Sequence, residues 1–126
     1  TCLAVLNWTV ATHISATDNS GWVFVETYAP SDPIPPPGWN TYTNELMQIK
    51  LDGSEVRRLT HHRSRPFTGN TYTYQPKLSI SRDGRKLAYA SNFGLQHSLG
   101  NPTNYSDVYL IDVSVISPDT LGTAAQ

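Results

Sequence analysis

Cysteine, charge and long apolar runs are all scarce in this sequence of 126 residues. A single cysteine, Cys2, excludes both an internal disulfide and a thiolate metal cluster. No apolar run approaches the ~20 residues of a membrane-spanning helix, so we expect no membrane span. The formal net charge of -1 and the scattered basic residues provide no patch that would bind nucleic acid. This polar, weakly charged composition favours an extracytoplasmic location, periplasmic or secreted.

Catalytic motifs are missing as well. The sequence contains no Gly-x-Ser-x-Gly elbow, no phosphate-cradling Gly-rich loop and no His-Glu-x-x-His. Asp52 and Asp83 lie in Asp-Gly turns, where a carboxylate stabilises the turn itself. The residues alone therefore predict no catalytic group. Because the chain starts at Thr1 without a methionine or a basic leader, we expect a processed product or an excised piece.

Strand signals take the place of helical periodicity. No window of a dozen residues holds an i, i+3, i+4, i+7 apolar stripe. The dipeptides Asp52-Gly53 and Asp83-Gly84 are typical of hairpin turns. Short β-branched and aromatic runs predict seven strands, at 12–17, 22–29, 45–51, 55–60, 77–81, 86–91 and 107–113. The sequence therefore predicts an all-β fold.

An internal repeat organises these strands. The stretch "NELMQIKLD" (44–52) aligns with "SDVYLIDVS" (106–114), and "THISATDNSGWVFVETYA" aligns with "KLSISRDGRKLAYAS". The period is about 63 residues, because long loops are predicted at 30–44, 61–76 and 92–106. Runs such as "WVFVETY" and "VYLIDV" are apolar on both faces, as expected of sheets packed between neighbouring sheets.

The repeat predicts a β-propeller segment of about two four-stranded antiparallel blades within a single domain, residues 1–126. Blade one spans about 12–60, blade two about 77–113, and a tail covers 114–126. Propellers typically close with ~4–8 blades, so we expect further blades or self-association to cover the open blade faces. A small β-sandwich is the alternative fold.

The stretches "ELMQIKLDGSEVRRLT", "PKLSISRDGRKLAYASN" and "SDVYLIDV" resemble the TolB-type, WD-like propeller repeat. In that family an aliphatic strand ends in Asp-Gly, Arg-Leu-Thr closes the blade, and the next blade opens before a Pro-Asp-Gly turn. This sequence carries Arg82 where the family usually has Pro, and Leu78 where Trp or Phe is common. The resemblance implies an exported bacterial protein with a propeller fold, a fold that hosts many functions.

A weaker similarity links "THISATD" and "LTHHRS" to the closing blades of oligogalacturonate lyase, a family of metal-dependent, pectin-degrading enzymes. The resemblance places His13 at the family's first metal-binding histidine and implies a divalent metal such as Mn. At the family's later histidines this sequence has Gln75 and Lys77, and Tyr72 stands where the family has a glutamine. Lys77 would repel a cation at such a site.

The loops contain the other candidate ligand-binding residues. Tyr72, Tyr74 and Gln75 lie in a Thr-rich loop, and rings beside amides and hydroxyls are typical of sugar recognition. His61 and Arg63 frame a His-His-Arg run that suits a metal or an anion. Adjacent residues of an extended chain point to opposite sides, which disfavours joint ligation by His61 and His62.

Three functions follow from these observations. The first is a non-catalytic binding or scaffold module that recognises a polysaccharide or a protein through its loops, without a cofactor. The second is a metal-dependent polysaccharide lyase that retains His13 as a ligand. The third is a truncated propeller fragment with no independent function.

Overall fold

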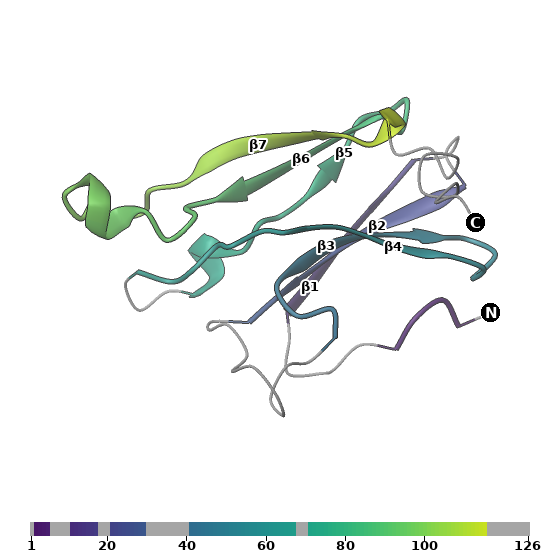
Figure 1. Ribbon diagram of the computed structural model, residues 1–126, viewed down its shortest axis with the longest axis horizontal. Coiled ribbons are helices and arrows are strands. Elements are labelled where there is room, and N and C mark those ends of the chain that lie inside the picture. The colour runs from purple at the N-terminus through teal and green to yellow at the C-terminus, as the bar shows by residue number, and fades with distance from the viewer. Residues whose placement is uncertain (1, 6–10, 18–20, 30–40, 68–70, 116–126) are drawn as a thin grey trace, which may run out of the picture.

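The computed structural model describes residues 2–5, 11–17, 21–29, 41–67 and 71–115. These residues form an all-β structure of two antiparallel sheets (Figure 1). The strands are β1 (Ala11–Ala16), β2 (Trp22–Tyr28), β3 (Glu45–Lys50), β4 (Val56–His61), β5 (Ser79–Ile80), β6 (Lys86–Ser91) and β7 (Asp107–Asp112). Three short 3-10 turns accompany them, at Thr71–Tyr74, Gln96–Leu99 and Val113–Val115. No helix in the described part of the chain is long and apolar enough to cross a membrane.

Each sheet is a meander in which neighbouring strands are consecutive in the sequence. The first sheet has the order β1-β2-β3-β4, and the second sheet has the order β5-β6-β7. All seven predicted strands are confirmed, and their ends agree with the predicted ends to within two residues. Two stacked antiparallel sheets fit both a partial propeller and a small β-sandwich.

The predicted Asp-Gly turns join β3 to β4 and β5 to β6. Gly53 and Gly84 have φ values of 77° and 72°, in the left-handed region that glycine adopts without strain. The Asp83 carboxylate accepts hydrogen bonds from the Ser81 hydroxyl (2.6 Å) and the Arg85 amide (3.1 Å). Asp52 accepts the Ser54 amide in the same way (2.8 Å). Both carboxylates therefore stabilise turns, as the sequence predicts.

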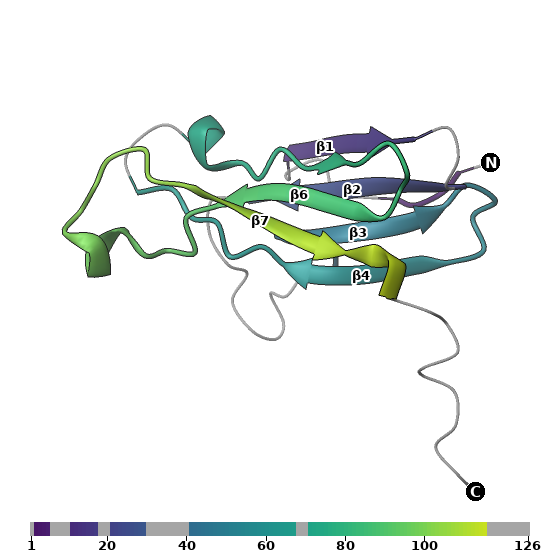
Figure 2. The same ribbon diagram turned by 90° about the horizontal axis from the view of Figure 1, so that it is seen from above.

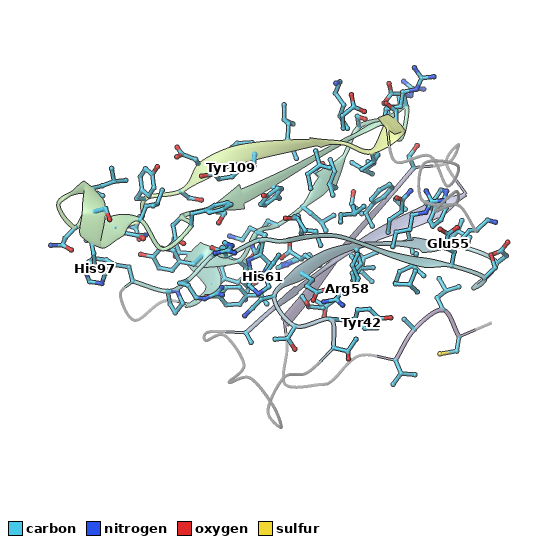
Figure 3. All side chains as sticks on the ribbon, viewed as in Figure 1. Tyr42, Glu55, Arg58, His61, His97 and Tyr109 are labelled. Atoms are coloured by element: carbon cyan, nitrogen blue, oxygen red, sulfur yellow. The ribbon has the colours of Figure 1, made fainter. Side chains whose placement is uncertain are left out.

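Strand direction gathers the long loops at one end of the molecule. Because the strands alternate in direction, the two Asp-Gly turns lie at one end, and the described parts of the β4–β5 and β6–β7 connections lie at the other (Figure 2). Glu55, beside a short turn, and His97, in a long loop, mark these opposite ends (Figure 3). We call the end with the long connections the loop end. The proline run of the β2–β3 connection lies outside the described residues.

The core lies between the two sheets. Phe24 and Leu46 of the first sheet pack against Leu87 and Tyr89 of the second, and all four are buried. A second cluster covers the opposite face of the first sheet, where Val25, Met47 and Ile49 are buried and Leu3 and Ala4 of the N-terminal segment pack against them. β2 and β3 of the first sheet are thus buried on both faces, as "WVFVETY" predicts for β2, whereas Ile14 of β1 is exposed.

The apolar run "VYLIDV" is buried on one of its two faces. Tyr109 and Ile111 of β7 pack against the central core, but Val108 and Leu110 on the opposite face are 74% and 70% exposed. The physical reason is that no described element packs over this face of the second sheet. The predicted tail lies, from residue 116 onward, outside the described residues.

Candidate functional site

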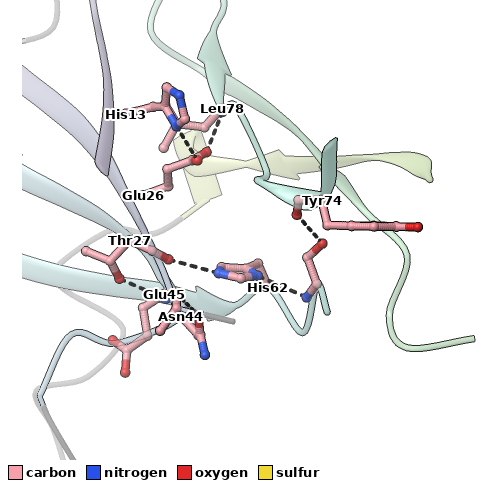
Figure 4. A network of polar contacts seen from close by, with 10 residues as sticks. His13, Glu26, Thr27, Asn44, Glu45, His62, Tyr74 and Leu78 are labelled. Carbon is pink, nitrogen blue, oxygen red and sulfur yellow. Dashed lines mark hydrogen bonds and ion pairs between the residues drawn. The ribbon is translucent and has the colours of Figure 1, made fainter. Parts of the chain in front are cut away.

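A buried carboxylate joins the two sheets near the start of β5. Glu26 of β2 is completely buried, and its Oε2 accepts a hydrogen bond from the Leu78 amide (2.7 Å) (Figure 4). Its Oε1 lies 2.7 Å from Nδ1 of His13, the residue directly opposite on β1. Such a carboxylate is stable inside a protein only when its oxygens are hydrogen-bonded, as both are here. Glu26 therefore connects the first strand of each sheet.

This contact gives His13 a structural partner. The side chain is 34% exposed, and its Nδ1 is engaged by Glu26. Metal-bound histidines commonly hold a carboxylate on the second ring nitrogen, so the pair by itself suits a metal site. However, the described residues contain no group of three or more His, Cys, Asp or Glu side chains that could hold a metal. The metal-ligand role of His13 stays a prediction.

A buried histidine ties the loop end to the first sheet. The Nδ1 of His62 accepts the Ser64 amide (3.0 Å), so its Nε2 carries the proton and donates to the Thr27 carbonyl (2.9 Å). The ring stacks on Tyr28 with 5.9 Å between centroids. Burial lowers the pKa of His62 to about 4, well below its usual value. His62 is therefore a neutral structural residue near pH 7.

His61 lies beside it, and the expectation that these two side chains point to opposite sides is wrong. Their rings stack with 6.0 Å between centroids, because β4 ends at His61 and the chain then turns. Arg63 has a left-handed φ of 54°, which completes the change of direction. Burial, followed by the charge of Arg63, lowers the pKa of His61. Arg63 is exposed and His61 is half-buried, and their ligand-binding role stays a prediction.

Further hydrogen bonds fix the loops to each other. The Ser64 hydroxyl donates to the Tyr74 carbonyl (2.5 Å), and the Ser91 hydroxyl donates to the His62 carbonyl (2.7 Å). The buried Asn92 side chain accepts the Arg65 amide (2.9 Å) and donates to the Arg65 carbonyl. The β4–β5 connection is thus held to β6 and to the loop after it. These bonds build a rigid base under the exposed loop residues.

The predicted ligand-binding residues of this loop divide into exposed and buried ones. Tyr72 is 60% exposed, and the Lys77 ammonium lies 4.1 Å from its ring centroid. Gln75 is half-buried, and its backbone amide donates to the backbone carbonyl of Tyr72 (3.3 Å). Tyr74 is only 2% exposed and packs inside the loop. The structure therefore presents Tyr72 and Lys77 to solvent together, with Gln75 next to them.

Two buried hydroxyls of the loop end have no hydrogen-bond partner. Tyr28 and Tyr74 are each 2% exposed, and neither phenolic oxygen is paired in the described residues. Burial raises the pKa of Tyr28, while Arg65 acts in the opposite direction. An unpaired buried hydroxyl costs roughly 1–3 kcal/mol, so ordered water is the simplest partner for each.

Sequence reasoning missed the buried polar residues that organise this region. Glu26 lies in the apolar run "WVFVETY". Pairing β1 with β2 in a hairpin places it opposite His13, and this cross-strand pair could have predicted the contact. The Ser64–Tyr74 and Asn92–Arg65 hydrogen bonds join residues 10 and 27 positions apart in the sequence, so no local sequence pattern indicates them.

No protein-family model, curated protein or solved structure matches this chain.

Proposed function

We propose that this chain forms two consecutive blades of a β-propeller and acts as a non-catalytic binding module, with a polysaccharide as the ligand of its loop end. The blade assignment is supported by the direction of equivalent faces. In the repeat alignment Leu46 corresponds to Val108, and Met47 corresponds to Tyr109. Leu46 faces the second sheet, and Val108 faces away from the first sheet, in the same direction.

Equivalent faces that point the same way define a head-to-tail stack. In such a stack each repeat presents one face to the unit before it and the other face to the unit after it, which is how repeats build rings and solenoids. The first strands also lie together, because the Ile80 amide of β5 donates to Ser15 of β1 (3.2 Å) and the Thr17 hydroxyl donates to the Arg82 carbonyl (2.8 Å). A propeller likewise aligns the first strands of its blades.

The ligand assignment is carried by the exposed ring of Tyr72 with Lys77 over it. A flat exposed ring stacks against a sugar, and an adjacent ammonium attracts a carboxylate on that sugar. The rigid base formed by His62, Ser64 and Asn92 fixes the loop, which lowers the entropy lost on binding. An acidic polysaccharide such as polygalacturonate is therefore the ligand class that this loop suits best.

Binding of fluorescently labelled oligogalacturonate, measured by anisotropy at low salt, tests the proposal. Tyr72→Ala should weaken binding about tenfold, the equivalent of ~1.4 kcal/mol for a lost stacking contact. Tyr72→Phe retains the ring and should bind as the unmodified chain does. Lys77→Gln should reduce binding, whereas Arg82→Gln, at the opposite end of β5, should leave it unchanged. Equal affinity of Tyr72→Ala and the unmodified chain would contradict the assignment.

A further inference from the structure

The free edge of β7 is the feature in which the two sheets differ most. In the first sheet β3 lies between β2 and β4. Its repeat equivalent in the second sheet, β7, pairs with β6 on one side. No strand in the described residues pairs with the other side. A strand edge of this kind presents a row of backbone donors and acceptors that can bind another extended chain.

The ladder shows which backbone groups of β7 point outward. The Val113 amide donates to the Arg85 carbonyl across the ladder (2.8 Å), so Val113 and every second residue before it bond to β6. The residues between them, Val108, Leu110 and Asp112, therefore direct their amides and carbonyls away from β6. Three amide donors therefore face outward along this edge, together with the carbonyls of Val108 and Leu110, while the Asp112 carbonyl begins the 3-10 turn Val113–Val115.

The equivalent residues of β3 show what such an edge binds. Leu51 donates to the Gly21 carbonyl (3.0 Å) on the β2 side, whereas the Lys50 amide donates to the Glu55 carbonyl (2.9 Å) on the β4 side. By the same alternation Leu46 and Gln48 also bond toward β4. The residues that bond toward β4 align with Val108, Leu110 and Asp112 of β7. The outward groups of β7 thus match the groups through which β3 holds β4.

Charge indicates the kind of strand that fits. β7 begins with Asp107, which accepts the Tyr105 hydroxyl and aligns with Glu45 of β3, whereas Asp112 at its other end is already paired with Lys86 (3.3 Å). Glu45 holds Arg58 of β4 through both carboxylate oxygens, one of them 2.6 Å from Arg58 Nε. On the open face the exposed side chains of Val108 and Leu110 provide apolar contact. Basic residues alternating with aliphatic ones would complement this edge.

We propose that the free edge of β7 is a strand-acceptor site for an extended segment of a partner polypeptide, which adds antiparallel to β7 and carries aliphatic and basic residues like those of β4. The backbone groups that receive the incoming strand are the amide donors of Val108, Leu110 and Asp112 and the carbonyl acceptors of Val108 and Leu110. Asp107 selects a basic residue on the incoming strand. This site lies apart from the Tyr72 loop and does not depend on a polysaccharide ligand.

A synthetic peptide with the sequence SEVRRLTH, copied from residues 54–61, is the probe. At saturating peptide the amide hydrogens of Val108, Leu110 and Asp112 should exchange at least about tenfold more slowly, because they become hydrogen-bonded. Amides of Tyr109 and Ile111, which already bond to β6, should change little. The readout is residue-resolved hydrogen exchange by NMR, with anisotropy of labelled peptide as the affinity measurement.

Two variants and two controls sharpen the test. Leu110→Pro removes the outward backbone amide of residue 110 and keeps the hydrogen bonds between β7 and β6. Asp107→Lys reverses the charge that would attract a basic residue of the peptide. Each variant should weaken peptide binding about tenfold or more. The charge-reversed peptide SEVEELTH should not bind, and Ile14→Ser, an exposed position on β1, should bind normally. Unchanged exchange of the three amides at saturating peptide would overturn the proposal. If exchange of these three amides slows with rising protein concentration in the absence of peptide, the edge binds a second copy of this chain. That result would overturn the proposal of a different partner polypeptide.

Discussion

The outer face of β2 and β3 in the first sheet is buried, whereas Val108 and Leu110 on the outer face of the second sheet are exposed. Met47 in the first sheet is 0% exposed and Val108 in the second is 74% exposed, although both belong to aliphatic strands of one repeat. Leu3 and Ala4 pack on the first sheet, and no described residue packs in this way over Val108 and Leu110. The difference shows that burial of a repeat strand depends on its neighbour in space as much as on its own apolar residues.

The joint between the sheets gives the largest expected effect. Replacing Glu26 with alanine leaves the buried Leu78 amide without an acceptor and removes the partner of His13, so we expect a loss of about 4 kcal/mol in the free energy of unfolding. Glu26→Gln keeps an acceptor for Leu78 and a hydrogen bond to Nδ1 of His13, and should cost only about 1 kcal/mol. Urea unfolding of both variants measures the difference, and equal losses would show that Glu26 does not join the sheets.

A matched pair of core substitutions tests the comparison directly. Leu46→Ala opens a cavity between the sheets and should cost about 3 kcal/mol. Val108→Ala, at the equivalent position of the repeat, should cost less than about 0.5 kcal/mol because its side chain is already exposed. Urea midpoints measured at two protein concentrations provide the data. A large loss for Val108→Ala would mean that the face is covered in solution.

Mild acid should weaken the loop end. The pKa of His62 is about 4 in the folded chain and about 6.5 when unfolded, so between these values only the unfolded chain binds the proton. Stability is therefore complete above about pH 6.5 and decreases as the pH falls toward 4, by about 2 kcal/mol at pH 5. His61, whose pKa is also lowered, adds a change of the same sign.

Unfolding free energies at pH 7.5 and pH 5 measure this effect, with His62→Gln as the control. Glutamine cannot take up a proton in this range, so the variant should lose most of the pH dependence and retain only the part due to His61. The aspartates with lowered pKa values, such as Asp52 and Asp83, act at lower pH, where their carboxylates titrate. An unchanged pH dependence in His62→Gln would contradict the assignment.

The strands and hairpins were predictable because their causes are local. Alternating apolar runs and the Asp52-Gly53 and Asp83-Gly84 turns act over a few residues, and each predicted strand is present in the structure. The exposure of Tyr72 and the burial of Tyr74 were not predictable in this way, although they are two residues apart in one 3-10 turn. That difference depends on which ring faces the packed side of the loop. The polysaccharide ligand, the metal role of His13 and the propeller assignment stay predictions.

The sequence by itself determined the all-β class, the seven strands and the two Asp-Gly turns. Each of these depends on backbone preferences and side-chain alternation within a short stretch of chain. Tertiary structure alone decided that Glu26 connects the two sheets, that His62 is buried and neutral, and that Val108 and Leu110 lie open while Met47 is covered. These outcomes depend on contacts between residues distant in the sequence, and only the packing of one sheet on another brings such residues together.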